Sequence, residues 1–215
     1  ELEEQLIARV IHESQAMYPN ITENSDYAGV FDERHFARLQ GYIDDAVAKG
    51  AKLTIVGADK TRAAENNRRM PLHILQNVTE DMQVMHEEIF GPILPVMTYT
   101  DITEVPDKIE PRRNPLALYY FGKDNAEQEY LLNHVPSGGA CINDITLHYV
   151  QEDLPFGGVG ASGMGAYHGP EGFKNMSHGR AIYSQTMIDI LPIVGARPPF
   201  GKKFRKNISK ILGAI

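Results

Sequence analysis

A glycine-rich segment, Leu154–Phe173 (LPFGGVGASGMGAYHGPEGF), constrains the fold of this 215-residue chain more than any other stretch. Seven of the 19 glycines of the chain lie in it: Gly157, Gly158, Gly160, Gly163, Gly165, Gly169 and Gly172. Glycine loses more conformational freedom on folding than other residues, so this density indicates positive φ angles or very close backbone approaches. A flexible linker would not carry bulky residues such as Phe156 and His168 at these intervals. We therefore predict a folded loop that wraps around a site.

Gly158–Gly163 within this segment matches the dinucleotide-binding pattern G-x-G-x-x-G. The pattern has meaning only where a buried strand precedes it and a helix begins at its last glycine. Here Pro155 and further glycines precede it, another glycine-rich run follows, and no βαβ unit is visible downstream. We interpret the match as accidental.

Composition indicates an ordinary globular protein, with 42% hydrophobic and 23% charged residues. The length suits one large domain or two small ones. The sequence shows neither a secretory signal nor an apolar run of about 18–20 residues that could span a membrane. A single cysteine, Cys141, excludes an internal disulfide framework and fits a reducing compartment. We therefore expect a cytoplasmic protein.

The net charge of −7 is unevenly distributed. No acidic residue follows Asp189, whereas six basic residues do, so the rest of the chain has 15 basic and 28 acidic side chains and a net charge of −13. The acidic body would repel nucleic acid, and no nucleic-acid partner is expected. The basic tail has apolar residues along one face of a short helical pattern. It could contact a membrane weakly or pack on its own dimer, and we favour the dimer.

Hydrophobic spacing and capping residues predict alternating helices and strands. Helices are expected over Glu1–Met17, Asp32–Lys49 and Asp124 to about Val135, with a short helix in Asp101–Arg113. Strands are expected over Lys52–Val56, Leu72–Val78, Gly91–Tyr99, Leu116–Phe121 and Gly139–Asn143, and Gly57–Met70 is expected to be a polar surface loop. Arg180–Thr186 resembles a late strand that needs a partner from elsewhere. The alternation predicts an α/β fold with a parallel-rich sheet flanked by helices.

A second candidate site is the acidic pair before Phe90. Neighbouring side chains in an extended segment point to opposite faces, so only one of Glu87 and Glu88 can face a given site. A carboxylate suits the vicinal hydroxyls of a ribose, and Phe90 would lie on the same face as Glu88. The residues by themselves favour the alternative, an acidic turn packed by Phe90 before a strand.

Cysteine and histidine give few further candidates. Cys141 lies in a predicted strand with no histidine nearby in the sequence, so we expect a structural thiol and not a nucleophile. The eight histidines lack paired-ligand spacing, and no metal site is predicted. His168 could contact a substrate or could hold the glycine-rich loop through backbone hydrogen bonds, and both possibilities stay open.

Two motifs together resemble the C-terminal part of the aldehyde dehydrogenase superfamily: Glu87–Pro92 (EEIFGP) and Pro155–Gly169 (PFGGVGASGMGAYHG). Ser137–Asp144 and Phe173–His178 are similar to family segments in the same order and spacing. The SGMGxYHG form resembles the class 3, fatty-aldehyde and coniferyl-aldehyde branch, and Asp32–Leu39 resembles the bacterial coniferyl-aldehyde type. The resemblance covers nearly the whole chain.

The resemblance implies a division of the chain into three parts. Residues 1–178 would be the C-terminal portion of the catalytic domain, 179–189 an oligomerisation strand and 190–215 a basic tail. Arg180–Thr186 would join the sheet of a neighbouring subunit, which implies a homo-oligomer, most simply a dimer. The nucleotide-binding domain would be absent.

The resemblance also implies an activity, the oxidation of aldehydes to carboxylic acids with NAD or NADP. In this family a cysteine thiolate attacks the aldehyde and hydride passes to the nicotinamide. By resemblance, Glu88 binds the nicotinamide ribose, Phe90 lies beside the cofactor, and Phe156 and His168 line the aldehyde pocket.

No catalytic residue is assigned, because the family's Gly-Gln-x-Cys segment is absent from this sequence. Glu1 aligns a little beyond that nucleophile, so the chain is expected to be a fragment without activity of its own. The alternative is a non-catalytic interaction module that is retained for its pairing strand.

Overall fold

The central strand of the first sheet, β2 (Leu72–Gln76), is buried along nearly its whole length because both of its faces are covered. The computed structural model describes residues 2–57, 68–112 and 114–213. In it, β2 pairs antiparallel with β1 (Lys52–Val56) and parallel with β3 (Ile93–Val96). The strand order is β1-β2-β3, so each neighbour protects one edge of β2.

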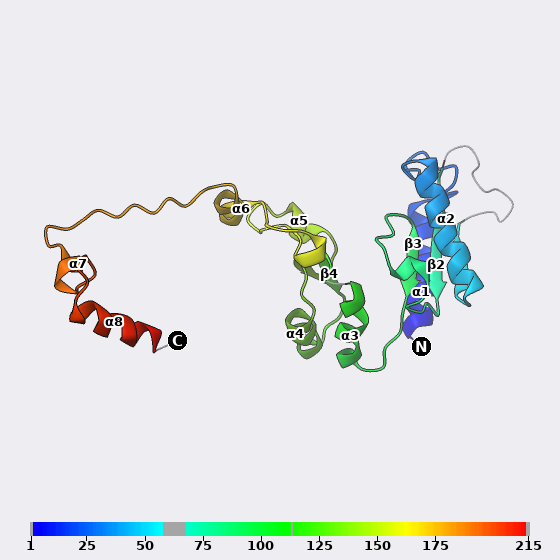
Figure 1. The fold of residues 1–215 in the computed structure, drawn as a ribbon. Helices are drawn as coiled ribbons and strands as arrows, with labels where there is room; N and C mark the ends of the chain where they lie inside the picture. The colour runs from blue at the N-terminus through cyan, green and yellow to red at the C-terminus, as the bar shows by residue number, and fades with distance from the viewer. Residues whose placement is uncertain (1, 58–67, 113, 214–215) are drawn as a thin grey trace.

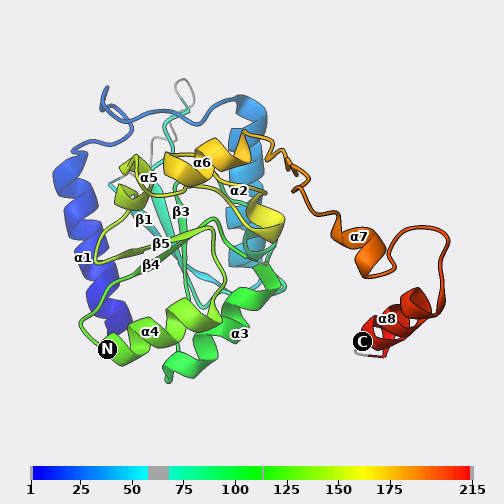
Figure 2. The same cartoon turned by 90° about the vertical axis from the view of Figure 1, so that its left-hand side faces the viewer.

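Two long helices cover the opposite faces of this sheet (Figures 1 and 2). Ile74 of β2 packs with Ile7 of α1 (Leu2–Met17), and Leu75 packs in the cluster that contains Leu39 of α2 (Glu33–Ala48). Successive side chains of a strand point to opposite faces, which explains why neighbouring residues of β2 belong to different clusters. The first body is therefore a three-layer α/β/α unit.

A second, two-stranded sheet pairs β4 (Ala117–Tyr120) parallel with β5 (Gly139–Ile142). The short helix α3 (Val105–Ile109) and the helix α4 (Asn125–His134) pack on it around Tyr120, Leu131 and Val135. The Asp124 side chain accepts hydrogen bonds from the amides of Ala126 and Glu127, which confirms the predicted start of α4.

The predicted α/β class is confirmed, and both sheets contain a parallel pair, but the expectation of one sheet is wrong. Among the described residues the strands form two separate sheets, and β1 is antiparallel to β2. Parallel neighbours need a crossover connection, which is usually helical. The β4–α4–β5 unit has one, whereas the sequence between β1 and β2 has no helical pattern. The expected surface loop Gly57–Met70 lies largely outside the described residues.

The glycine-rich segment is a folded loop, as predicted. It lies between α5 (Leu147–Val150) and α6 (Gly169–Asn175), and Phe156 and Tyr167 bridge it through two 2.9 Å backbone hydrogen bonds. A Cβ at Gly157 or Gly158 would overlap a carbonyl oxygen of the same loop. Only a short 3-10 turn, η4 (Gly160–Ser162), coincides with the dinucleotide pattern, so the match is accidental, as the sequence indicated.

The C-terminal residues extend away from both bodies before α7 (Ile190–Ile193) and α8 (Lys202–Leu212) (Figure 1). Arg180–Thr186 is exposed and has no strand partner within the described chain. Of the helices in the described ranges, none has the length and apolar character that crossing a bilayer requires.

Candidate functional site

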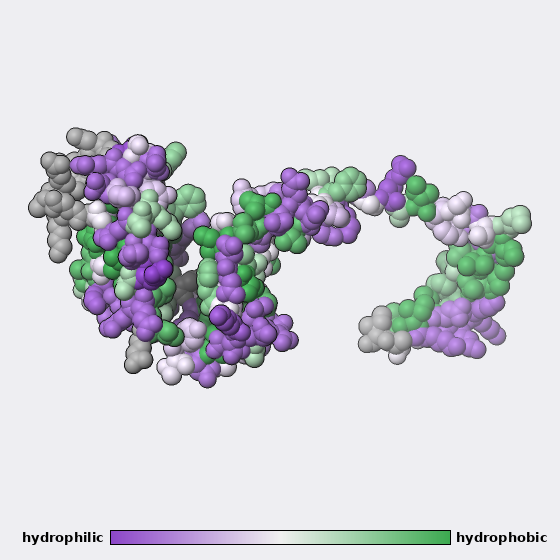
Figure 3. Space-filling view, turned by 180° about the vertical axis from the view of Figure 1, so that it is seen from behind, coloured by the Kyte–Doolittle hydropathy of each residue, from purple (hydrophilic) through white to green (hydrophobic). Residues whose placement is uncertain are grey.

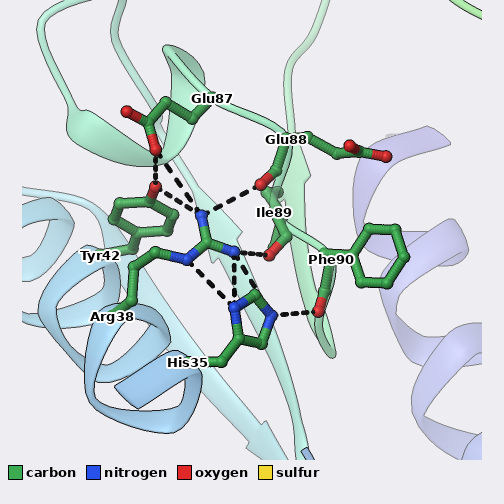
Figure 4. A network of polar contacts seen from close by, with 7 residues as sticks. All are labelled: His35, Arg38, Tyr42, Glu87, Glu88, Ile89 and Phe90. Carbon is green, nitrogen blue, oxygen red and sulfur yellow. Dashed lines mark hydrogen bonds and ion pairs between the residues drawn. The ribbon is translucent and has the colours of Figure 1, made fainter. Parts of the chain in front are cut away.

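The segment that carries Glu87, Glu88 and Phe90 is fastened to α2 by side chains from that helix (Figure 4). Arg38 donates from Nη1 to the carbonyl oxygen of Glu88 at 3.1 Å and from Nη2 to that of Ile89 at 2.7 Å. His35 Nε2 lies 2.7 Å from the carbonyl oxygen of Phe90. Three successive carbonyls are thus held by two residues one helical turn apart.

His35 contacts both Arg38 and the backbone of Phe90. Arg38 Nε and Nη2 lie 3.3 and 3.1 Å from His35 Nδ1, and a guanidinium can only donate. Nδ1 is therefore the acceptor and Nε2 carries the proton that is donated to Phe90. Through its two ring nitrogens, His35 connects the guanidinium of Arg38 to the backbone of Phe90.

The carboxylate of Glu87 contacts two side chains of α2, Tyr42 and Arg38. The Tyr42 hydroxyl donates to its Oε2 at 2.7 Å, and Arg38 Nη1 donates to the Tyr42 hydroxyl oxygen at 2.7 Å and lies 3.7 Å from the same carboxylate oxygen. Burial, followed by the hydrogen bond to Glu87, raises the pKa of Tyr42 above its ordinary value, and Arg38 opposes this shift. Tyr42 therefore remains a protonated donor at neutral pH.

Glu88 and Phe90 project together, away from this network (Figure 4). Glu88 is exposed, and its carboxylate makes no hydrogen bond or ion pair within the described chain. Phe90 is 76% exposed and has a positive φ of 51°. The structure thus brings the two predicted cofactor-binding residues together, and it leaves Glu88, and not Glu87, free of internal contacts. The alternative in which Phe90 packs the turn is wrong.

These two side chains offer a carboxylate and an aromatic ring side by side. The Glu88 carboxylate offers two oxygens that can accept hydrogen bonds side by side from vicinal hydroxyls. The exposed Phe90 ring offers an apolar face next to them. Within the described residues, the Glu88 carboxylate has no hydrogen-bond or ion-pair partner, and the Phe90 ring makes an edge-to-face contact with His35, with ring centroids 6.3 Å apart.

The two predicted substrate residues lie in the glycine-rich segment. The ring of Phe156 packs between aromatic neighbours, with ring centroids 5.8 Å from His148, 5.3 Å from Tyr149 and 5.7 Å from Tyr167. His168 precedes α6 with a φ of 73°, and its Nδ1 is buried without a hydrogen-bond partner in the described part of the chain. A ring nitrogen that is already buried and unpaired is suited to receive a ligand group.

The cofactor pair and the substrate pair do not share a cavity. The hollow beside Phe90, of about 880 Å³, is formed by α2 and the loop before it together with the Phe90–Pro92 turn. Phe156 and His168 do not line it, and Glu88 lines a separate hollow of about 690 Å³. The described residues therefore present two half-sites.

The sequence analysis did not identify the residues that hold the first half-site. His35, Arg38 and Tyr42 recur at helical spacing, which places them on one stripe of α2. A polar stripe next to the apolar stripe of the same helix was the sequence signal that could have identified these three residues.

His148 was also missed by the sequence analysis. Both of its ring nitrogens are buried and unpartnered within the described residues, and no sequence pattern marked it.

Cys141 lies half-buried in β5, where it is paired in register with Tyr119 of β4. The position of Cys141 within a strand agrees with the expectation that this thiol is structural. In the described ranges, no group of three or more His, Cys, Asp or Glu side chains is arranged to hold a metal ion.

Comparison with known proteins places the chain in a family. Residues 1–182 match the model of the aldehyde dehydrogenase family. A probable coniferyl aldehyde dehydrogenase from Caulobacter vibrioides is 45% identical over 193 residues, which are 89% of this chain and 40% of that protein. The coniferyl aldehyde dehydrogenase of Pseudomonas sp. strain HR199 is 37% identical over 92% of this chain and 41% of its own length.

A solved structure agrees with this assignment. The substrate-bound state of Staphylococcus aureus AldH aligns with a TM-score of 0.73 and 33% identity, over 97% of this chain and 44% of that one. The chain spans about two fifths of the length of the curated relatives it matches. With most of its residues matched by the family model, the chain belongs to the aldehyde dehydrogenase family.

Proposed function

We propose that this chain is the C-terminal part of the catalytic region of an NAD(P)⁺-dependent aldehyde dehydrogenase. The substrates would be aromatic aldehydes of the coniferyl type or long-chain aldehydes, which would be oxidised to carboxylic acids. The names of the relatives from Caulobacter and Pseudomonas support the coniferyl type. The single cysteine suits a cytoplasmic location.

The observation that carries this proposal is the exposed Glu88 carboxylate beside the exposed ring of Phe90. In the proposed enzyme, Glu88 would accept hydrogen bonds from the ribose next to the nicotinamide, and Phe90 would limit where the ring lies. Phe156 and His168 would contribute to the wall of the aldehyde pocket. Such positioning contributes to catalysis by holding reactants in a productive geometry.

The covalent step would need residues that this sequence does not contain. No Gly-Gln-x-Cys segment is present, and Cys141 lies within a strand of the second sheet. Positioning without a nucleophile leaves no thiohemiacetal from which hydride could leave. We therefore propose that the chain is inactive by itself and acts within a longer protein, with residues 1–178 in the catalytic domain.

The test compares two proteins for NADH formation from coniferaldehyde. Chain 1–215 should show none, and the longer reading frame that contains it should be active. In the longer protein, Glu88→Gln should raise the dissociation constant for NAD⁺, with Glu129→Gln, at an exposed carboxylate of α4 outside this network, as the control. Activity of chain 1–215 alone would contradict the proposal, as would an inactive long protein that binds no NAD⁺.

A non-catalytic interaction module is the second candidate, and one observation favours it. Arg180–Thr186 is an exposed segment without a strand partner in the described chain, and it contains the exposed apolar residues Ile182 and Tyr183. Such a segment pairs readily with another chain. Proline cannot donate to a strand ladder, and adjacent residues alternate in their bonding to one neighbour. Self-association or partner binding should therefore be lost in Ile182→Pro or in Tyr183→Pro, and assembly that survives both substitutions would contradict this reading.

A further inference from the structure

We propose that Arg38, together with His35, is a positioning residue that presents Glu88 to the cofactor and withholds Glu87. This inference rests on the function proposed above. It concerns residues that touch only the protein, so they would act through Glu88 and not on the ligand.

The contacts fix the path of the backbone. The carbonyls of Glu88, Ile89 and Phe90 all accept hydrogen bonds from α2. Once three successive carbonyls are held on one side, the directions of the intervening side chains are set. The hydrogen bond from His35 also holds Phe90 in a left-handed conformation, which residues other than glycine adopt only when their surroundings stabilise it.

The same guanidinium selects between two adjacent carboxylates. Through Tyr42, and by its own approach to 3.7 Å, Arg38 ties the carboxylate of Glu87, whose side chain is 69% exposed, to α2. Adjacent side chains point in opposite directions, so retaining Glu87 directs Glu88 outward (Figure 4). Without this contact, the two carboxylates could exchange places by a rotation of the backbone.

Arginine is specifically suited to this position. Its Nε, Nη1 and Nη2 atoms all have partners, which are His35, the Tyr42 hydroxyl and the carbonyls of Glu88 and Ile89. A planar guanidinium has five donors in a rigid fork, whereas a lysine ammonium has three on a flexible stem. Arg38→Lys should therefore retain only part of the effect.

The experiment is a double-mutant cycle on NAD⁺ affinity, measured calorimetrically in the longer protein. We expect Arg38→Gln to weaken NAD⁺ binding about tenfold, since charge-assisted hydrogen bonds are lost. The NAD⁺ affinity of Arg38→Lys should lie between those of the wild type and Arg38→Gln. Lys52→Gln is the control, because Lys52 is a cationic residue of the same sheet body, is exposed, does not line the hollow beside Phe90 and forms no hydrogen bond or ion pair through its side chain in the described chain. The affinity of this control should be unchanged.

Measuring Arg38→Gln in a protein that already carries Glu88→Gln distinguishes an effect through Glu88 from a general loss of stability. If Arg38 acts through Glu88, Arg38→Gln should add little to the loss that Glu88→Gln already causes. A full tenfold loss in that background would overturn this inference and leave the proposed role of Glu88 intact. Unchanged NAD⁺ affinity in Glu88→Gln alone would refute that role and, with it, any presentation of Glu88 to the cofactor.

A second readout needs no cofactor. In chain 1–215, hydrogen–deuterium exchange of the amides between residues 86 and 92 should accelerate in Arg38→Gln and stay unchanged in Lys52→Gln. Equal exchange in both variants would show that Arg38 does not hold the segment, which would overturn the inference.

Discussion

Gly91, next to the exposed Phe90, lies directly against Leu39 of α2. A Cβ at Gly91 would overlap Leu39 Cδ1 and lie 2.8 Å from Cδ2. Leu39 is fully buried, so it has little space into which to move. The absence of a side chain at position 91 thus allows the Phe90 turn to pack closely on the helix that holds it.

Gly91→Ala should therefore destabilise chain 1–215 by about 1–3 kcal/mol, the range found for overpacked cores. The free energy of unfolding can be measured by urea titration. Gly41→Ala is the control: Gly41 lies in α2, and an added Cβ would have nothing within 4 Å, so alanine should stabilise the helix by about 0.5–1 kcal/mol. Combining Gly91→Ala with Leu39→Ala should be less harmful than the sum of both, and strict additivity would contradict the proposed clash.

His73 is a single residue that should make the stability of the folded chain depend on pH. It is a buried polar residue of β2 whose Nδ1 lies 2.7 Å from the carbonyl oxygen of Pro71. Burial lowers the pKa of His73 below its ordinary value of 6.5, and the hydrogen bond to Pro71 partly opposes this shift. The unfolded chain therefore binds a proton at a higher pH than the folded chain does.

Stability should consequently fall as the pH decreases from 6.5 through the folded-state pKa of His73, and should be independent of this group above pH 6.5. Urea midpoints between pH 7.5 and pH 5 would measure this fall. His73→Asn should reduce it, whereas the exposed His178→Asn should not. Carboxylates with a lowered pKa, such as Asp101, titrate below 3.8 and so outside this window. An identical fall in wild type and His73→Asn would contradict the prediction.

The sequence could predict which residues matter at this scale only where a pattern marks them. The resemblance carried by the EEIFGP motif pointed to Glu88 and Phe90, and alternation indicated that only one of Glu87 and Glu88 could face a given site. The partner that holds Glu87 was not predictable, because Tyr42 and Arg38 lie 45 and 50 residues away from the atoms they bind. Such pairings depend on how α2 crosses the β3 side of the sheet, which periodicity does not encode.

At the scale of elements, α2 is the part that joins the core to the candidate site. One face packs Leu39, Ile43 and Ala46 against the sheet, and the adjacent stripe carries His35, Arg38 and Tyr42. Its first turn is fixed by Asp32, whose Oδ1 accepts a hydrogen bond from the His35 amide at 2.6 Å. The cap thus sets the backbone of a residue that also contacts Phe90.

Asp32→Ala should cost about 1 kcal/mol of stability, as is typical for the loss of an N-cap. It should also increase amide exchange in the Phe90 turn, because the first turn of α2 carries His35. Asp32→Ser retains a capping oxygen and should behave like the wild type. An Asp32→Ala protein with normal stability and normal exchange would show that neither the cap nor its link to the turn is needed.

Helices and strands could be predicted from the sequence where capping residues or apolar spacing marked them clearly. Asp32, Gly50 and the apolar stripe marked α2 nearly to the residue, and β1 was predicted with its observed bounds. The assembly of strands was not predictable, because the division between β3 and β4 depends on contacts between distant segments. Arg180–Thr186 shows the converse: its strand-like composition was evident, but within the described chain no neighbour pairs with it.

At the scale of the whole molecule, charge and hydropathy are segregated along the chain. The C-terminal helices present apolar residues on one side and basic residues on the other (Figure 3). They also pack on each other: the Phe200 and Phe204 rings are 4.4 Å apart, and Asn207 donates to the carbonyl oxygen of Val194 at 2.9 Å. Asp189 is paired with Arg197 at 2.6 Å, and no acidic residue follows it in the sequence, so the unit keeps a net positive charge.

Two surfaces could cover the apolar side of α8, which includes Phe204, Ile208, Ile211 and Leu212. An acidic body with a net charge of −13 attracts a basic tail, so a second copy of the chain offers charge complementarity as well as apolar contacts. An anionic membrane offers the same two features, but a single helix of 11 residues binds bilayers only weakly. We therefore expect the tail to pack on a second copy.

Ile208→Asp tests this expectation, because it places a charge in the middle of the apolar side without touching the basic one. Light scattering should show a dimer for chain 1–215 and a monomer for Ile208→Asp, since burying an unpaired carboxylate at an interface is strongly unfavourable. Lys206→Gln, on the basic side of the helix, is the control and should weaken the dimer only at low salt, because surface charges are screened. Co-sedimentation of the wild-type chain with phosphatidylglycerol vesicles, lost both in Ile208→Asp and on deletion of residues 202–215, would instead identify a membrane as the surface that α8 covers.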